Sequence, residues 1–164
     1  MSDLSKTSRE IILEELSQLR ASILQNLARY NRNATGETAR SLRIQLNPDG
    51  GTLFGRNHFY TLEVGRGPTR NITPSTPTLR ERIYAWIQAK GVHVDGYTDL
   101  SLSYAIAKTI HKLGTKLFRD KKMQDIYSTA LDEAIKRINY RLLEEAKVTV
   151  NNIHINLGQG AKIE

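Results

Sequence analysis

Apolar residues near the amino end of the chain recur at spacings of three and four, the pattern of an amphipathic helix. They form one stripe: Ile12, Leu16, Leu19, Ile23, Leu27 and Tyr30. We predict a helix from about Thr7 to Tyr30, with Glu14 and Glu15 on its exposed face. Asn31 is expected to end this helix, because asparagine tolerates the left-handed backbone conformation that closes helices.

An alternating pattern follows, which is typical of half-buried strands. Apolar and polar residues alternate from Leu42 to Leu46, and the turn sequence Pro48-Asp49-Gly50-Gly51 separates them from a second short run. Residues 41–55 are therefore predicted to form a β-hairpin. A similar alternation from His58 to Val64 predicts a third strand.

Helical patterns return after a glycine- and proline-rich loop at residues 65–77. A loop of this length in a small domain is either functional or poorly ordered. The capping box Thr78-Leu79-Arg80-Glu81 predicts the start of one helix. A cap at Thr98 or Asp99 predicts a second helix, which Gly114 ends.

The remaining segments are a third loop at residues 115–122, a long helix at about 122–146, and an alternating run at 148–157 that predicts a final strand. The fold class is therefore predicted to be α+β. We expect a small antiparallel sheet, made of the hairpin and the C-terminal strand. A long N-terminal helix, two middle helices and a long C-terminal helix pack on it. The prediction is one domain, residues 1–164, with an extended arm at 65–77.

The composition excludes several kinds of chemistry. The chain has 164 residues and no cysteine, so disulfides, thiolate metal sites and thiol nucleophiles are ruled out. Its formal net charge of +7 favours a polyanionic partner, although a charge of this size also serves ordinary solubility. The first residues are polar and no run approaches the roughly 18 apolar residues of a membrane span. We therefore expect a soluble protein made in the cytoplasm, without a membrane partner.

No motif in the chain matches a known reaction centre or cofactor site. Gly65-Arg66-Gly67 lacks the third glycine and the following helix of a dinucleotide fingerprint. The four histidines lack the spacing of a metal site. The acid pairs Glu14-Glu15 and Glu144-Glu145 fall on predicted exposed helix faces, where nothing shifts their pKa values apart. We expect no catalytic residue, no cofactor and no metal, and hence no enzyme.

Basic residues supply the candidate site. Arg66 and Arg70 flank the Gly67-Pro68 turn, and a second group of cations surrounds Phe118. Such a cluster suits a phosphate backbone or an acidic protein surface. The alternative is that these residues merely complete helix ends. The candidate partner-binding residues are Arg66, Gly67, Pro68, Arg70, Lys116, Phe118, Arg119, Lys121 and Lys122.

Two short motifs resemble the tail-completion, neck and minor tail proteins of tailed bacteriophages. They run from Thr35-Gly36 through Ser41-Leu42, and then through Tyr60, Glu63, Gly65 and Gly67-Pro68. The stretch from Ala105 to Thr115 is similar to related phage morphogenesis proteins. Members often carry Gly-x-x-Pro-Phe before the last helix, whereas residues 115–119 of this chain contain no proline.

The resemblance implies a role in the virion and not a reaction. Copies would form a homo-oligomeric ring at the head–tail junction, assembled in the host cytoplasm. The ring would bridge portal or connector proteins and tail tube proteins, with DNA backbone contact in the channel as an option. The loop at 65–77 would be an interlocking arm that orders on assembly. Two alternatives remain open, a basic nucleic-acid-binding module and a hydrolase with a loop lid.

Overall fold

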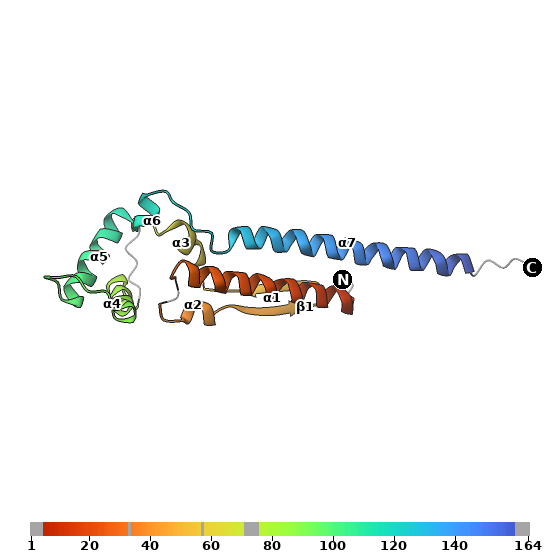
Figure 1. Ribbon diagram of the computed structural model, residues 1–164, viewed down its shortest axis with the longest axis horizontal. Helices are drawn as coiled ribbons and strands as arrows, with labels where there is room; N and C mark the ends of the chain where they lie inside the picture. The colour runs from red at the N-terminus through yellow and green to blue at the C-terminus, as the bar shows by residue number, and fades with distance from the viewer. Residues whose placement is uncertain (1–4, 33, 57, 71–75, 160–164) are drawn as a thin grey trace, which may run out of the picture. The chain divides into compact units, whose positions relative to one another are not determined.

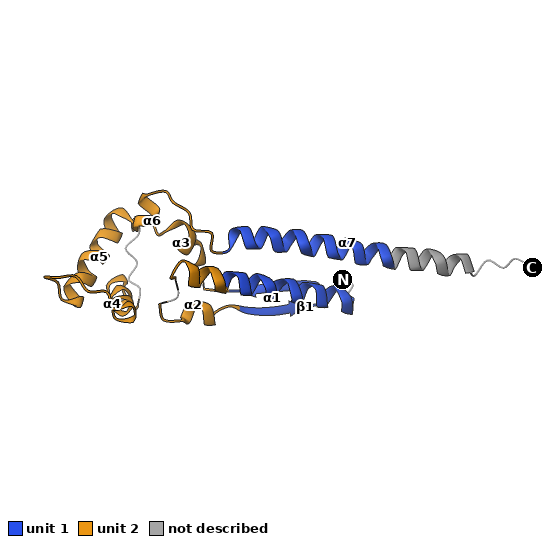
Figure 2. Cartoon of the chain, viewed as in Figure 1, with its two compact units in different colours: residues 1–23, 43–54, 127–164 blue, residues 24–42, 55–126 orange. Residues whose placement is uncertain are grey.

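The computed structural model describes residues 5–32, 34–56, 58–70 and 76–159, with side chains described as far as Val148 (Figure 1). The chain divides into two compact units (Figure 2). Unit 1 comprises residues 1–23, 43–54 and 127–164, and unit 2 comprises residues 24–42 and 55–126. Helix α1, Lys6–Arg29, contributes to both units. The expectation of a single folded domain stays a prediction.

Unit 1 combines the first part of α1 with a β-hairpin and helix α7, Ser128–Gln159. Strand β1, Arg43–Asn47, pairs antiparallel with β2, Gly50–Phe54, so that Arg43 lies opposite Phe54. The hairpin packs closely on α1, because a Cβ atom on Gly51 would lie 2.7 Å from the side chains of both Ile12 and Leu16. Glycine at this position therefore lets the sheet and the helix meet.

Glu15 on α1 is the central polar contact of unit 1. Its side chain is 3% exposed and accepts hydrogen bonds from Arg137 Nε at 2.7 Å and Arg141 Nη1 at 2.9 Å, both on α7. Burial alone would raise the pKa of Glu15, but the hydrogen bonds and positive charge of the two arginines outweigh it and lower the pKa below its ordinary value. The carboxylate thus fixes how α7 lies along α1, and the prediction that it is exposed was wrong.

Unit 2 is built from five short helices and the end of α1. They are α2, Glu37–Arg40; α3, Phe59–Val64; α4, Leu79–Lys90; α5, Asp99–Leu113; and α6, Lys116–Arg119. Helices α4 and α5 pack together, with Ile87 of α4 and Ala107 of α5 buried. Thr78 and Glu81 form the predicted capping box of α4, and Thr98 is the N-cap of α5.

A buried acid joins α3 to the end of unit 2. Glu63, 1% exposed, accepts a hydrogen bond from the backbone N–H of Ile126 at 2.9 Å through its carboxylate. Its own carbonyl accepts the N–H of Gln124 at 2.9 Å. Asn26 of α1 donates to the carbonyl of Ile126 at 3.1 Å. Three separate segments of the chain are therefore held at one point.

The structure confirms the predicted α+β class, the long helices at both ends, the hairpin and both middle helices. The predicted third strand is wrong, because residues 59–64 form α3. A strand would have placed Glu63 and Phe59 on the face opposite Tyr60. A helical turn instead buries Glu63 and leaves Tyr60 64% exposed.

The predicted C-terminal strand is also wrong, because the backbone of residues 148–157 continues α7. Val150, Ile153 and Leu157 are spaced by three and four as well as lying in an alternating run, so the sequence pattern fits a helix equally well. The sheet of the described residues accordingly has two strands. Helix α7 begins at Ser128 and not near residue 122, and the loop at 115–122 contains α6.

Every helix in the described part of the chain is too short or too polar to cross a lipid bilayer.

Removing the buried carboxylate should destabilise unit 1. We expect Glu15→Ala to lower the free energy of unfolding by about 1–3 kcal/mol at neutral pH, less than for a fully buried ion pair because both arginines reach solvent. Glu14→Ala is the matched control, since Glu14 is exposed and its hydrogen bonds to Arg141 and Gln18 lie at the surface; it should cost less than about 1 kcal/mol. Urea unfolding measures both values.

The effect of Glu15→Ala should also depend on pH. The folded-state pKa of Glu15 is lowered, so its contribution is present above the ordinary value of 4.5 and is lost as the pH falls through the folded-state pKa. The difference in the free energy of unfolding between the wild type and Glu15→Ala should therefore become smaller as the pH falls. A difference that stays constant or widens below pH 4.5 would contradict this account of the Glu15 ion pairs.

Candidate functional site

The segment that follows α3 is fixed on the turn that leads into α6. The N–H of Thr115 donates to the carbonyl of Arg66 at 2.8 Å, and the N–H of Arg66 donates to Thr115 Oγ1 at 3.0 Å. Gly65 adopts φ 81 and ψ 167, a conformation essentially restricted to glycine. A Cβ atom there would lie 2.4 Å from the backbone nitrogen of Phe118. Glycine is thus required both by conformation and by contact.

A second set of bonds fixes the same segment to the end of α5. The N–H of Thr69 donates to the carbonyl of His111 at 3.0 Å, and Thr69 Oγ1 lies 2.7 Å from His111 Nδ1. Arg66 Nη2 donates to Thr69 Oγ1 at 3.1 Å. The hydroxyl of Thr69 therefore links the guanidinium of Arg66 to the imidazole of His111.

We call the resulting surface the basic corner, residues 65–70 and 116–122. It contains all nine residues predicted for partner binding and brings the two predicted groups together. Phe118 is 43% exposed and covers Gly67, where a Cβ atom would lie 3.2 Å from its ring. Pro68 and Arg70 are exposed, and Arg66 and Gly67 are half-buried. The rest of the predicted arm, at 71–75, lies outside the described residues, and its ordering on assembly stays a prediction.

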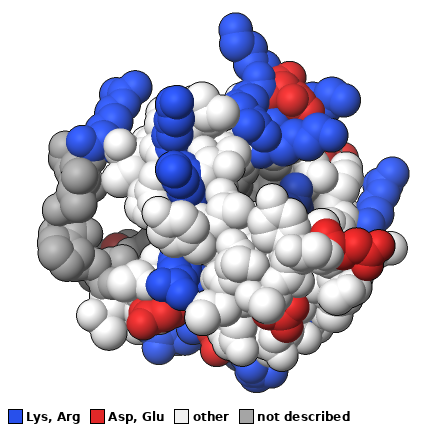
Figure 3. Space-filling model, turned by 90° about the vertical axis from the view of Figure 1, so that its left-hand side faces the viewer, with Lys and Arg blue, Asp and Glu red and all other residues white. Residues whose placement is uncertain are grey.

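Four cations in the second part of the basic corner, residues 116–122, are exposed and have no carboxylate within ion-pair distance among the described residues. They are Lys116, Arg119, Lys121 and Lys122. Lys121 has a positive φ of 51, which turns the chain sharply after α6. Lys and Arg side chains gather toward the upper edge of the face seen in Figure 3. The corner thus presents uncompensated positive charge to solvent, as an acidic partner requires.

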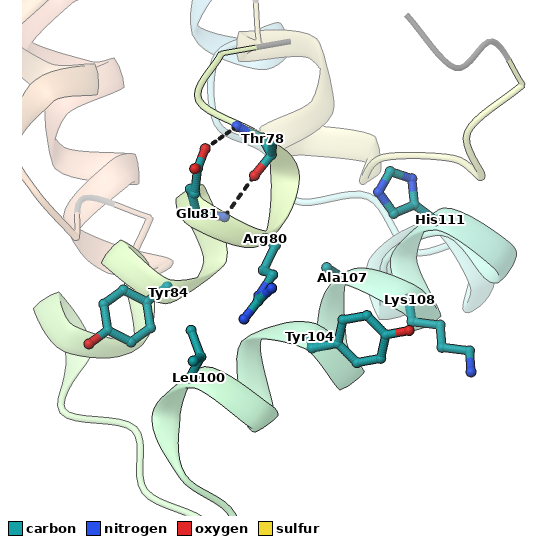
Figure 4. A pocket seen from close by; sticks show the side chains of 9 residues that line it. All are labelled: Thr78, Arg80, Glu81, Tyr84, Leu100, Tyr104, Ala107, Lys108 and His111. Carbon is teal, nitrogen blue, oxygen red and sulfur yellow. Dashed lines mark hydrogen bonds between the residues drawn. The ribbon is translucent and has the colours of Figure 1, made fainter. Parts of the chain in front are cut away.

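A groove of about 810 Å³ lies between α4 and α5 and adjoins the basic corner through His111 (Figure 4). Exposed apolar side chains line it, with Leu100 54% and Tyr104 56% exposed. The guanidinium of Arg80 lies over the ring of Tyr104, 6.0 Å from its centroid. Exposed aromatic and aliphatic side chains beside cations are typical of protein contact surfaces.

The charge in this groove is mainly positive. The cations Arg80 and Lys108 line it, and the acid among the described lining residues is Glu81. That carboxylate accepts the N–H of Thr78 at 2.6 Å in the capping box, and this backbone hydrogen bond lowers the pKa of Glu81. Because Glu81 is committed to its own helix, the groove favours an acidic occupant with apolar side chains.

This groove was not predicted from the sequence. Leu100 and Tyr104 are four residues apart on α5, and Arg80 and Tyr84 have the same spacing on α4. Side chains four apart share one helix face, so two such pairs were a readable signal of a second apolar surface.

The histidines whose side chains are described do not form a metal-binding cluster. Among the described residues, no three His, Asp or Glu side chains lie close enough to hold a metal ion. His58 accepts or donates a hydrogen bond with Thr38 Oγ1 at 3.2 Å, and burial together with the positive charge of Arg56 and Arg82 lowers its pKa. These contacts give His58 a local packing role.

The chain matches no protein-family model, no curated protein and no solved structure. The case for a function therefore depends on the basic corner, the groove and the motifs themselves.

The requirement for glycine at the corner can be measured directly. Gly65→Ala should lower the free energy of unfolding by about 3–4 kcal/mol, because it adds a disfavoured backbone conformation to a clash with Phe118. Gly91→Ala is the control, since Gly91 also has a positive φ but nothing lies within 4 Å of its Cβ position. That variant should cost about 1–2 kcal/mol. Equal losses in thermal or urea unfolding would show that the close approach of residue 65 to α6 is unimportant.

Proposed function

We propose that this chain is a structural protein of a tailed-phage virion, a ring-forming neck or tail-completion subunit that joins head-side connector proteins to the tail. The resemblance of its Thr-Gly and Glu-Val-Gly-x-Gly-Pro motifs to that group of proteins supports the biological role. The surface chemistry supports the physical role, which is contact and not catalysis.

The observation that carries the proposal is the basic corner. Two backbone hydrogen bonds, from Thr115 to Arg66 and from Thr69 to His111, fix its shape. A surface built this way loses little conformational entropy when a partner binds. Its exposed cations and Phe118 combine electrostatic attraction with a large apolar contact, which suits a protein interface.

The groove between α4 and α5 supplies a further contact surface of different chemistry. A closed ring is made by heterologous contacts, in which one surface of each copy meets a different surface of the next. A subunit of such a ring must also contact the components above and below it. A basic corner and a cationic apolar groove in the same unit are consistent with a chain that meets several neighbours at once.

A nucleic-acid-binding module is the second candidate, and the same four exposed cations favour it. It differs from the first candidate in its salt dependence. If those cations neutralise DNA phosphates, the slope of log affinity against log salt concentration should be about −3 to −4. For a virion subunit we expect weak DNA binding by the isolated chain and self-association or recruitment to tail components. Filter binding or fluorescence anisotropy with duplex DNA over a salt series separates the two.

Charge reversal at the corner tests the proposed function. We expect the triple variant Lys116→Glu, Arg119→Glu, Lys122→Glu to stay folded by circular dichroism and to lose ring formation or incorporation into particles, both scored by negative-stain electron microscopy. The matched control reverses three exposed cations of α1, Lys6, Arg9 and Arg20, and should assemble as the wild type does. Assembly of the corner variant at the wild-type level would overturn the role given to the corner.

A further inference from the structure

A second cleft of unit 2 lies where the end of α1 meets α3 and α4. Its volume is about 430 Å³, and its lining includes Asn31, Arg32, Leu62, Trp86, Lys90 and Val92. It shares no lining residue with the α4–α5 groove and none with the basic corner. The proposed function makes no use of it.

Arg32 places a positive charge in this cleft without a matching acid. Its side chain is half-buried, and its Nε donates to the neutral amide oxygen of Gln124 at 2.7 Å. In the described part of the chain no carboxylate lies within ion-pair distance of the guanidinium. Burial accordingly lowers the pKa of Arg32. Burying a cation against neutral groups alone is unfavourable, so an anion at this position would relieve a cost that the free protein carries.

Lys90 adds a second cation to the same cleft. It is half-buried at the end of α4, and its Nζ donates to the side-chain oxygen of Asn31, again a neutral partner. Asn31 has a positive φ of 53, which ends α1 and brings its amide to the cleft. None of the described residues that line the cleft is acidic. Two cations that share a partly enclosed site therefore attract an anionic group.

The remaining lining residues are apolar. Trp86 and Leu62 come from α4 and α3, and Val92 follows α4. An indole beside two cations can pack against an aromatic or aliphatic body while the cations bind a charged group. The volume of the cleft lies in the range of sites for small molecules, roughly 300–1,000 Å³.

We propose that this cleft binds a small organic anion, in which a carboxylate or phosphate group is joined to an aromatic or apolar body. Arg32 and Lys90 hold the anionic group, and Trp86 packs against the apolar part. The inference is independent of the proposed function, because a virion subunit and a nucleic-acid-binding module could each carry such a site. The competing explanation is that Arg32 only fastens the end of α1 to the segment at Gln124.

The chain supplies its own reporter, because Trp86 is its single tryptophan. The experiment titrates the full chain with benzoate, AMP and inorganic phosphate, exciting the indole selectively and holding ionic strength constant with sodium chloride. We expect a saturable change in Trp86 fluorescence with benzoate or AMP, and weaker binding of inorganic phosphate, which lacks an apolar body. Saturation with benzoate alone assigns a carboxylate ligand, and saturation with AMP alone assigns a phosphate ligand.

Substitutions of Lys90 and Arg32 separate a binding role from a packing role. Lys90→Gln keeps a hydrogen-bonding side chain on the surface and should raise the dissociation constant about tenfold, as expected for loss of one charge-assisted contact. Arg32→Gln should raise it further, and Arg32→Lys should restore part of the affinity if charge is what the site needs. Lys112→Gln is the control, since Lys112 is an exposed lysine of α5 outside the cleft.

The proposal fails if no probe gives saturation up to about 10 mM, the weak end of specific binding. The proposal also fails if the Lys90→Gln variant binds benzoate and AMP as tightly as the Lys112→Gln variant does. A loss of stability in Arg32→Gln leaves the comparison of the two lysine variants intact, so the test does not depend on that variant folding. Ring formation by these variants is expected to be unchanged, which keeps this result separate from that of the proposed function.

Discussion

The close approach of the Gly65 backbone to the start of α6 is the constraint on which the candidate site depends. A side chain at residue 65 would collide with the backbone of Phe118, so the chain can pass there only as glycine. This passage allows Arg66 and Thr115 to exchange two hydrogen bonds. It also places Phe118 over Gly67 and leaves four cations of α6 and of the turn after it in solvent. One backbone contact therefore determines the geometry of a whole surface.

The two units illustrate two uses of charge. In unit 1, Glu15 is buried between Arg137 and Arg141, and the acid and its partners compensate one another inside the fold. In unit 2, the cations of the basic corner and of the Arg32 cleft have no carboxylate partner among the described residues. Paired charges position elements, whereas unpaired ones are available to a partner or ligand. The net charge of +7 is thus partly concentrated in places where binding can use it.

The sequence predicted those elements whose signals are local. The capping box at Thr78 and Glu81, the turn between Asn47 and Gly50 and the apolar stripe of α1 each follow from short-range rules, and each is present. The prediction of a strand at residues 58–64 was wrong because a seven-residue alternating pattern cannot be distinguished from two turns of a half-buried helix. The contact that decides between them, from the N–H of Ile126 to Glu63, spans 63 positions of the sequence. The prediction of a C-terminal strand was wrong for a similar reason, since the apolar residues of that segment fit the period of a helix as well as that of a strand.

The basic residues of the corner were predictable as a group, but the hydrogen bonds that join residues 65–70 to α5 and α6 were not.

We infer that the basic corner already has its shape in the isolated chain and presents that shape to neighbours. Amide hydrogen exchange tests this claim most directly, because the N–H groups of Thr69 and Thr115 donate to carbonyls across the corner and not within a helix. We predict that both amides are protected in the purified single chain, to a degree comparable with the amides of α5, and that assembly changes their exchange little. Exchange of Thr69 and Thr115 at the rate of an unfolded chain, with protection appearing only on assembly, would show that the corner is made by its partners and would contradict the account.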